Sequence, residues 1–368
     1  MTGKLPSHHG LPIEPLAQLF RNVFTSYKFF WFLAILENLT QEEGQTIGYR
    51  QLFATMVAKV WYPVHYFKLS FGKRDMLSDK AMEILQHDPE GFSIDMAPGK
   101  LMKLLQQHPD REISAMLFHF QKEVPYRFLT AWLGSGKEAS LSSLEKTIEK
   151  RSQTFEKDCL YRLNYGEERS ITINPKWQAY LFTHRSILQE YTYWNLLLYL
   201  QRRNPNVPDI ASKLVKPIKR RSLKAQRDLW DYYLDIQGPI QCIYTGKLMH
   251  RGEYDLDHFI PWSFLPNDQL WNLIPGNPAV NSSKSNNLPD LDYYLPEFAR
   301  TQQKALKVFF EQGKSKLLED YTELRLEPQE LVKLSVEAFT ERYRETMSPL
   351  VQIAANSGFP KNWKWTPR

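Results

Sequence analysis

The chain has 368 residues, of which 42% are hydrophobic and 24% charged, and its formal net charge at pH 7 is +6. This length allows two or three domains, and the hydrophobic content excludes a disordered protein. Only two cysteines occur, Cys159 and Cys242, and neither has a CxxC partner, which excludes a four-cysteine structural zinc and a disulfide framework. So few cysteines, with no signal-peptide pattern at the N-terminus, predict a protein of the reducing cytoplasm.

Residues 1–212 are predicted to form a helical domain with a recognition or regulatory role. From Pro15 to Ile35, apolar residues recur at helical spacing and predict one helix. Its segment FFWFLAIL is the most membrane-like in the chain, but it has eight residues where a membrane span needs about twenty. We therefore exclude a membrane protein and expect this helix to lie in the centre of a domain.

Turn-forming residues divide the rest of this region. Residues 42–48 are polar and predict a loop. Residues 160–173 consist of two short β-type runs around Gly166 and predict a small hairpin. Pro175 is predicted to open one long helix that continues to Gln201.

The strongest charge run, KLVKPIKRRSLKAQR, occupies residues 213–227 and contains seven basic residues and no acid. A solvated helix face usually mixes both signs, so an unbroken basic run favours contact with a phosphate backbone. A basic linker or an intramolecular clamp is the alternative interpretation. We expect residues 213–237 to form a basic linker followed by a helix. The candidate DNA contacts are Lys213, Lys216, Lys219, Arg220, Arg221, Lys224 and Arg227.

Residues 238–292 are predicted to form a small module of two strands, a long loop and a helix. The strands are expected at residues 241–247 and 254–259, and the helix at residues 281–286. This order brings the end of the second strand and the helix together.

Four side chains in this module form a candidate site. Asp257 and His258 end the second strand, and Asn281 and Lys284 share one face of the helix. A carboxylate and an amide oxygen suit a hard metal ion, and a neutral imidazole can take a proton from water. Metal-dependent hydrolysis of a phosphodiester needs such a set.

The spacing of these residues resembles that of the HNH nucleases, the ββα-metal group, and most of all the HNH domain of the RNA-guided CRISPR effector nuclease. That domain also has a DxDH strand, a PxSF turn, an Asn fourteen residues after the His and an NxxKSxNxP helix. The resemblance covers about fifty residues, from Cys242 to Pro289, and includes the CIYTG sequence at 242–246. The matching segments are Asp255–His258, Pro261–Phe264, Asn272 and Asn281–Pro289.

The resemblance implies a role for each matching position. His258 would be the general base, and Asp257 and Asn281 would hold Mg²⁺ or Mn²⁺. Asn272 would tie the loop together and orient the base. Lys284 would meet the charge of the phosphate, a solvated lysine being the alternative. Asp255 would be an additional acid or ligand.

Two departures from the wider family matter. Asn281 stands where many members have a final His, and an amide favours a hard metal. The two CxxC zinc pairs of many members are missing, so we expect no structural zinc. Four apolar side chains would then pin the loop by packing: Trp262, Phe264, Leu265 and Trp271.

Residues 293–368 are predicted to form a helical C-terminal extension, with helices at 295–311, 314–321 and 328–356. The tail KNWKWTPR is basic and aromatic, which suits either covering another surface or contacting nucleic acid. The predicted fold class is therefore α+β and mostly α-helical.

The expected function is Mg²⁺-dependent cleavage of DNA, as nicking by a monomer or double-strand cleavage by a dimer. Stand-alone HNH chains with long helical extensions resemble those of bacterial restriction and anti-phage defence, where a partner protein or a signal would act through residues 1–212. The oligomeric state stays open. A ribonuclease or toxin of the same fold is one alternative, and a non-catalytic adaptor that binds nucleic acid is another.

Overall fold

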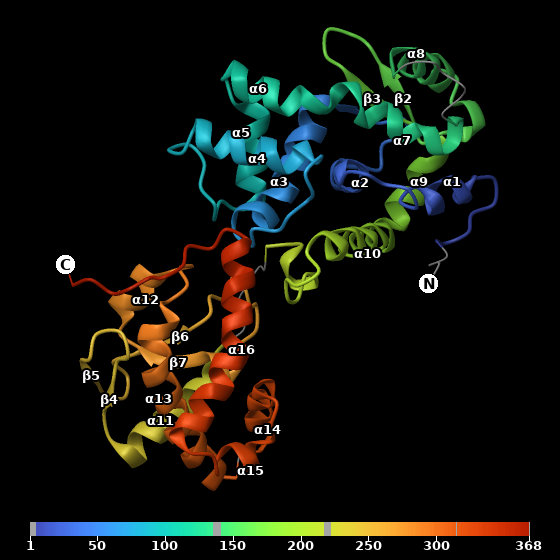
Figure 1. Ribbon diagram of the computed structural model, residues 1–368. Coiled ribbons are helices and arrows are strands. Elements are labelled where there is room, and N and C mark those ends of the chain that lie inside the picture. The colour runs from blue at the N-terminus through green and yellow to red at the C-terminus, as the bar shows by residue number, and fades with distance from the viewer. Residues whose placement is uncertain (1–4, 135–140, 217–221, 314, 368) are drawn as a thin grey trace. The chain divides into compact units, whose positions relative to one another are not determined.

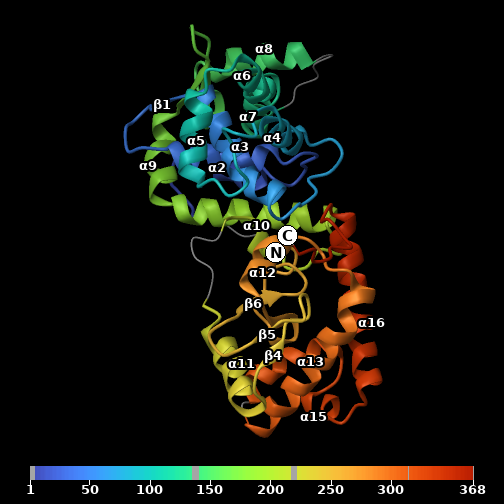
Figure 2. The same ribbon diagram turned by 90° about the vertical axis from the view of Figure 1, so that its left-hand side faces the viewer.

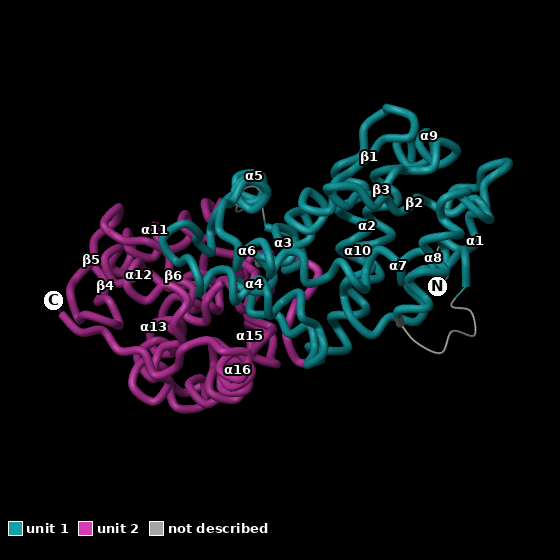
Figure 3. The backbone as a smooth tube through the Cα atoms, turned by 90° about the horizontal axis from the view of Figure 1, so that it is seen from above, with its two compact units in different colours: residues 1–205, 213–216 teal, residues 206–212, 217–368 magenta. Residues whose placement is uncertain are grey.

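The computed structural model describes residues 5–134, 141–216, 222–313 and 315–367. The described chain is mostly helical with three small sheets, so the predicted α+β class is confirmed (Figure 1). It divides into two compact units (Figure 3). Unit 1 comprises residues 1–205 and 213–216, and unit 2 comprises residues 206–212 and 217–368.

Unit 1 is organised around helix α2, Tyr27–Asn38. Every residue from Phe29 to Leu36 is at most 1% exposed, so the predicted central helix is confirmed. No helix in the described ranges is both long and apolar enough to cross a membrane. The other helices of this unit are α1 Ile13–Gln18, α3 Tyr49–His65, α4 Met76–His87, α5 Pro98–Gln107, α6 Arg111–Leu117, η1 Phe118–Lys122, α7 Val124–Leu133, α8 Leu141–Ser152, η2 Glu156–Asp158, α9 Pro175–Thr183 and α10 Arg185–Arg203. The short 3-10 helix η3, Ala211–Lys213, spans a boundary between the two units, because residue 212 belongs to unit 2 and residue 213 to unit 1.

Two long helices predicted in unit 1 are each broken. The helix expected from Pro15 to Ile35 is instead α1 and α2, because the carboxylate of Asp75 accepts a hydrogen bond from the Ser26 backbone amide just before α2 begins. The helix expected from Pro175 is likewise divided at His184 into α9 and α10. The first break involves a contact between segments that are distant in sequence, and the spacing of apolar residues cannot predict such a contact.

A three-stranded antiparallel sheet, in the order β1-β3-β2, completes unit 1. The predicted hairpin is confirmed as β2 Tyr161–Asn164 and β3 Ser170–Ile173. The prediction of a loop at 42–48 was wrong for its last three residues, because Thr46–Gly48 form strand β1, which pairs with β3.

The first α-helix of unit 2 is α11, Lys224–Gln237, and the unit contains two antiparallel strand pairs. The first pair is β4 Ile240–Gln241 with β5 Leu248–Met249. The second pair is β6 Asp255–His258 with β7 Leu273–Gly276. Helix α12, Pro278–Lys284, follows directly.

The arrangement of this module differs from its prediction in two strands and one helix. The strand expected at 241–247 ends at Gln241, and the following residues turn, with the Gly246 amide donating to the Cys242 carbonyl. The missed strand β7 contains Pro275, which argues against a strand in the sequence. Helix α12 starts three residues early, because Asn277 caps it and Pro278 fills its first turn.

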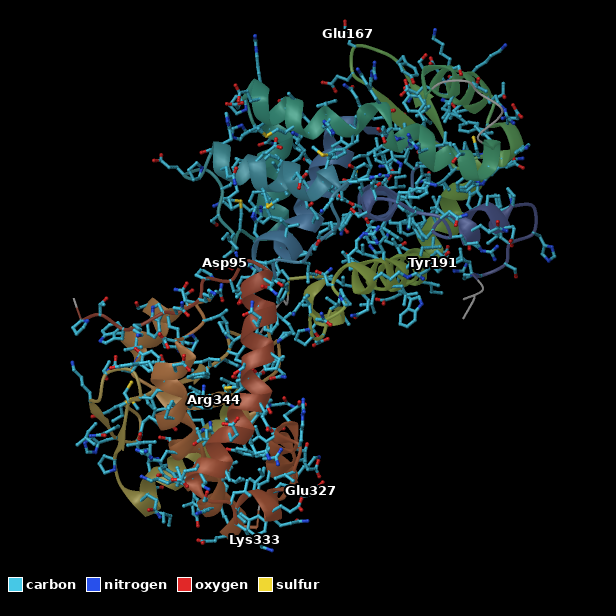
Figure 4. The ribbon with its side chains drawn as sticks, viewed as in Figure 1. Asp95, Glu167, Tyr191, Glu327, Lys333 and Arg344 are labelled. Atoms are coloured by element: carbon cyan, nitrogen blue, oxygen red, sulfur yellow. The ribbon has the colours of Figure 1, made fainter. Side chains whose placement is uncertain are left out.

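The C-terminal helices of unit 2 are built on α13, Leu291–Glu311, which packs against α16, Val336–Asn356 (Figure 2). Arg344 of α16, labelled in Figure 4, forms an ion pair with Asp292 of α13 at 3.1 Å. Between them lie α14 Ser315–Leu318, η5 Glu319–Leu324 and α15 Pro328–Leu331. The helix expected at 328–356 is interrupted before Val336, where Ser335 caps α16.

Candidate active site

Asp257, in strand β6, is a buried carboxylate with a partner on each oxygen. Its side chain is 3% exposed. Oδ1 accepts a hydrogen bond from the Lys284 ammonium at 3.0 Å, and Oδ2 accepts one from the Tyr244 hydroxyl at 2.6 Å. Burial, followed by the nearby carboxylate of Asp257, raises the pKa of the Tyr244 phenol well above its usual value, so Tyr244 stays a hydrogen-bond donor.

Lys284 joins helix α12 to the end of strand β6. Its ammonium also donates to the backbone carbonyl of His258 at 2.6 Å, and its side chain is 1% exposed. Lys284 is therefore not a solvated lysine. Because it occupies the last turn of α12, its charge also suits the negative end of the helix dipole.

Asn281 lies one turn before Lys284 on α12, which packs against β6. Residues three apart share a helix face, so the amide of Asn281 and the pair formed by Lys284 with Asp257 lie on the same side of α12. The Asn281 side chain is half-buried and makes no hydrogen bond to any residue that the structure describes. Its oxygen is therefore available to a ligand.

The oxygen donors of Asp257 and Asn281 fit a hard metal ion. Within the described ranges, no group of three or more His, Cys, Asp and Glu side chains is placed to hold a metal. One carboxylate and one amide leave most of the shell to water and substrate oxygens, a pattern typical of Mg²⁺. Asp255, two residues before Asp257 on β6, has a half-exposed side chain that lies 3.9 Å from the guanidinium of Arg227 of α11, and its predicted role as an additional acid or ligand stays a prediction.

His258 is the last residue of β6, and its ring contacts an acid that the sequence analysis missed. Its Nε2 lies 3.0 Å from Oδ1 of Asp268, and the two side chains are 12% and 21% exposed. Asp268 lies in the loop between β6 and β7, ten residues after His258. No periodicity links these two positions, so only the loop conformation reveals the pair.

Asn272 closes the loop that carries Asp268. The side chain is fully buried, and its amide nitrogen donates to the Ile260 carbonyl at 2.9 Å. Its amide oxygen accepts from the Ile260 backbone amide at 2.8 Å. Both ends of the loop are thereby joined by one side chain.

Polar side chains of the C-terminal helices form hydrogen bonds with the backbone of the same loop. Gln302 of α13 donates to the carbonyls of Leu270 and Leu273, and its own oxygen accepts from the Tyr321 hydroxyl at 2.6 Å. Asp320 accepts from the Leu270 amide at 2.9 Å. We name Gln302, Asp320 and Tyr321 the loop clamp. Of the apolar residues expected to pin the loop, Phe264, Leu265 and Trp271 are buried and Trp262 is partly exposed.

The C-terminal tail packs against residues of this module. Trp363 pairs with Pro289 in a short parallel bridge, next to the end of the matching motif. Its ring also lies 5.5 Å from that of Tyr244, the residue that donates to Asp257. Of the two roles considered for the tail, covering another surface is therefore the one seen for Trp363.

The described residues of the basic run differ in their surroundings. Lys213 is fully buried, and Lys216 donates to the Asp95 carbonyl within unit 1. Lys224 is exposed in the first turn of α11. Arg227 is half-buried, and it donates to the Tyr254 carbonyl at 3.0 Å. Lys219, Arg220 and Arg221 lie outside the described residues.

Replacing Lys284 by Met should test how much the buried pair of Lys284 and Asp257 stabilises the fold. The carboxylate would stay buried without its cation, so we expect the free energy of unfolding in EDTA to fall by about 3–5 kcal/mol. If Asp257 is a metal ligand, excess Mg²⁺ should stabilise both proteins, and Lys284→Met more, because in the variant no ammonium competes with the ion for the carboxylate. Urea unfolding in EDTA and in Mg²⁺ measures both effects. Lys247→Met, at an exposed lysine of the same unit, is the control. Equal stability of Lys284→Met and wild type in EDTA would contradict the buried pair.

Replacing Gln302 by Leu should test the loop clamp. The change leaves two backbone carbonyls and a hydroxyl without their partner, and each such buried group costs about 1–3 kcal/mol. The matched control is Gln303→Leu, because Gln303 is also buried but donates to the carbonyls of Leu334 and Ser335. Both variants should unfold at lower urea concentration. Only Gln302→Leu should also lower the rate of the phosphodiester cleavage that the sequence predicts, measured where the variant is folded, and equal rates in the two variants would argue against the clamp.

Comparison with known proteins identifies part of unit 2. Residues 242–290 match the family model described as HNH endonuclease. No curated protein and no solved structure gives a significant match to the chain. The matched segment contains β5, β6, β7 and α12 together with Asp257, His258, Asn272, Asn281 and Lys284. Residues 242–290 therefore constitute an HNH nuclease module, flanked by helical regions that no comparison identifies.

Proposed function

We propose that this chain is a Mg²⁺-dependent endonuclease that hydrolyses phosphodiester bonds in DNA. The observation that carries the proposal is the meeting of β6 and α12, where Lys284 contacts both Asp257 and His258. Asn281 lies on the same face of α12 with its amide available. An acid, an amide and an imidazole are thus gathered within an HNH module.

In this proposal each residue has a separate task. Asp257 and Asn281 supply the oxygen ligands of the ion. The bound Mg²⁺ supplies charge that polarises the scissile phosphate and stabilises the leaving 3′ oxygen. His258 accepts the proton of the attacking water. Lys284 keeps the end of β6 attached to α12, so that the base and the ligands stay at fixed positions.

The position of α11 supports DNA as the substrate. Arg227 binds the Tyr254 carbonyl just before β6, and Tyr254 donates to Asp231 at 2.7 Å, so α11 is fixed to the strand that ends at His258. The exposed Lys224 lies one turn from that anchor. A cation held next to the site by a rigid helix suits the phosphate backbone of a bound duplex.

His258→Ala should abolish cleavage and leave binding unchanged. Loss of a general base is expected to lower the rate by about 10²–10⁴-fold. Purified protein would be incubated with single-stranded DNA, double-stranded DNA and RNA in Mg²⁺ and in EDTA, and binding would be followed by fluorescence anisotropy. His250→Ala is the control, because His250 is exposed in the same unit.

The outcomes separate the rival functions. Cleavage of RNA alone would identify a ribonuclease. Binding by both His258→Ala and wild type with no cleavage in Mg²⁺ or Mn²⁺ would identify an adaptor that only binds nucleic acid.

Reversing the charge of Lys219, Arg220 and Arg221 to Glu should weaken DNA binding. Each lost phosphate contact should also reduce the slope of log K against log salt by about 0.9. Titrations at several salt concentrations measure this slope. Reversal of Lys304, Lys307 and Lys333, three exposed lysines of unit 2, controls for the same change in net charge. A slope equal to that of wild type would assign the run to a linker or an intramolecular clamp instead.

A further inference from the structure

We infer that Asp268 is a positioning residue for the proposed base, His258. Its carboxylate accepts a hydrogen bond from Nε2–H of the imidazole and so leaves Nδ1 as the atom that takes the proton from water. The inference rests on the proposed nuclease function for its kinetic consequence, but the Asp268–His258 pair itself can be tested without DNA.

The geometry of the pair determines which ring nitrogen is the base. A neutral imidazole carries one N–H donor and one acceptor nitrogen, and an ionised carboxylate only accepts. Nε2 lies 3.0 Å from the Asp268 carboxylate, so Nε2 is the donor and Nδ1 holds the lone pair. Nδ1 makes no hydrogen bond within the part of the chain that the structure describes. The ring is thus held at one nitrogen and available at the other.

Asp268 is itself held on both sides, which makes it suitable for orienting a ring. Its backbone carbonyl accepts from the Gln226 side chain of α11 at 2.8 Å. On one side, the Asn267 amide donates to the Leu265 carbonyl at 2.8 Å. On the other, the Leu270 amide is bound by the loop clamp. The carboxylate therefore belongs to a braced segment of the loop, and a fixed ring loses less entropy when it reaches the reactive geometry.

The resemblance to HNH nucleases assigned the orientation of the base to Asn272. In this chain, both polar atoms of the Asn272 amide are bonded to the backbone of Ile260. Asn272 therefore closes the loop, whereas Asp268 contacts the ring. The two tasks are divided between two residues of the same loop.

The first test examines the pair directly in the full-length protein. With ¹⁵N-labelled histidine, the His258 signals are identified by their disappearance in His258→Ala. We expect neutral His258 to carry its proton on Nε2 and to show a slowly exchanging ring N–H. Asp268→Ala should lose the slow exchange, and Asp292→Ala, which removes an exposed carboxylate of α13, should keep it. A proton on Nδ1 in the wild type, or unchanged exchange in Asp268→Ala, would overturn the inference.

The second test separates positioning from other uses of a carboxylate. Asp268→Ala should lower kcat by about 10²-fold or more and leave KM for DNA within about twofold. Asp268→Glu should recover at least about tenfold of this loss, because it restores the acceptor. Asp268→Leu keeps a similar side-chain volume but has no acceptor, and it replaces the alanine variant if that variant unfolds.

Other patterns would point to other roles. A raised KM with unchanged kcat would make Asp268 a substrate contact, and weaker Mg²⁺ binding by calorimetry would make it a metal ligand. Either result overturns the positioning role. If the wild type cuts no nucleic acid, the proposed function fails, and the exchange measurement alone decides whether Asp268 holds His258.

Discussion

A buried carboxylate is the constraint on which the rest of unit 2 depends. The two oxygens of Asp257 need hydrogen-bond partners in the protein interior, and the Lys284 ammonium and the Tyr244 hydroxyl supply them. The need for Lys284 fixes where α12 must end. The need for Tyr244 fixes where the turn after β4 must lie, and the Trp363 ring packs behind it. One buried carboxylate thus connects four segments that are far apart in sequence.

The loop between β6 and β7 shows how buried side chains order an irregular segment of this chain. Asn272 joins its ends, and the loop clamp from α13 and η5 binds the backbone of residues 270–273. Hydrogen bonds from buried side chains are directional, so they fix a backbone more narrowly than apolar packing alone. The side chains of Asp268 and His258 are held in place by the same contacts, because both residues lie in or next to this segment of the loop.

Much of the site could be predicted because its residues are close in sequence and separated by fixed intervals. Asp257, His258, Asn281 and Lys284 were proposed in this way, and the matched family confirms the module that contains them, while their roles stay predictions. Other features depend on contacts that no local pattern encodes. Strand β7 was missed because Pro275 disfavours a strand, and the break before α2 depends on Asp75, about fifty residues away. Asp268 and Gln302 were missed because a lone Asp in a loop and a buried Gln in a helix carry no signal.

The loop clamp has a consequence for how this nuclease module can be used. Gln302, Asp320 and Tyr321 all lie beyond residue 290, where the family match ends. Residues 242–290 therefore do not contain all the contacts that order the module. Grafted onto another protein without α13 and η5, it would keep Asp257, His258 and Asn281 but lose the hydrogen bonds that order its loop. A fusion designed from this chain would have to take unit 2 as a whole.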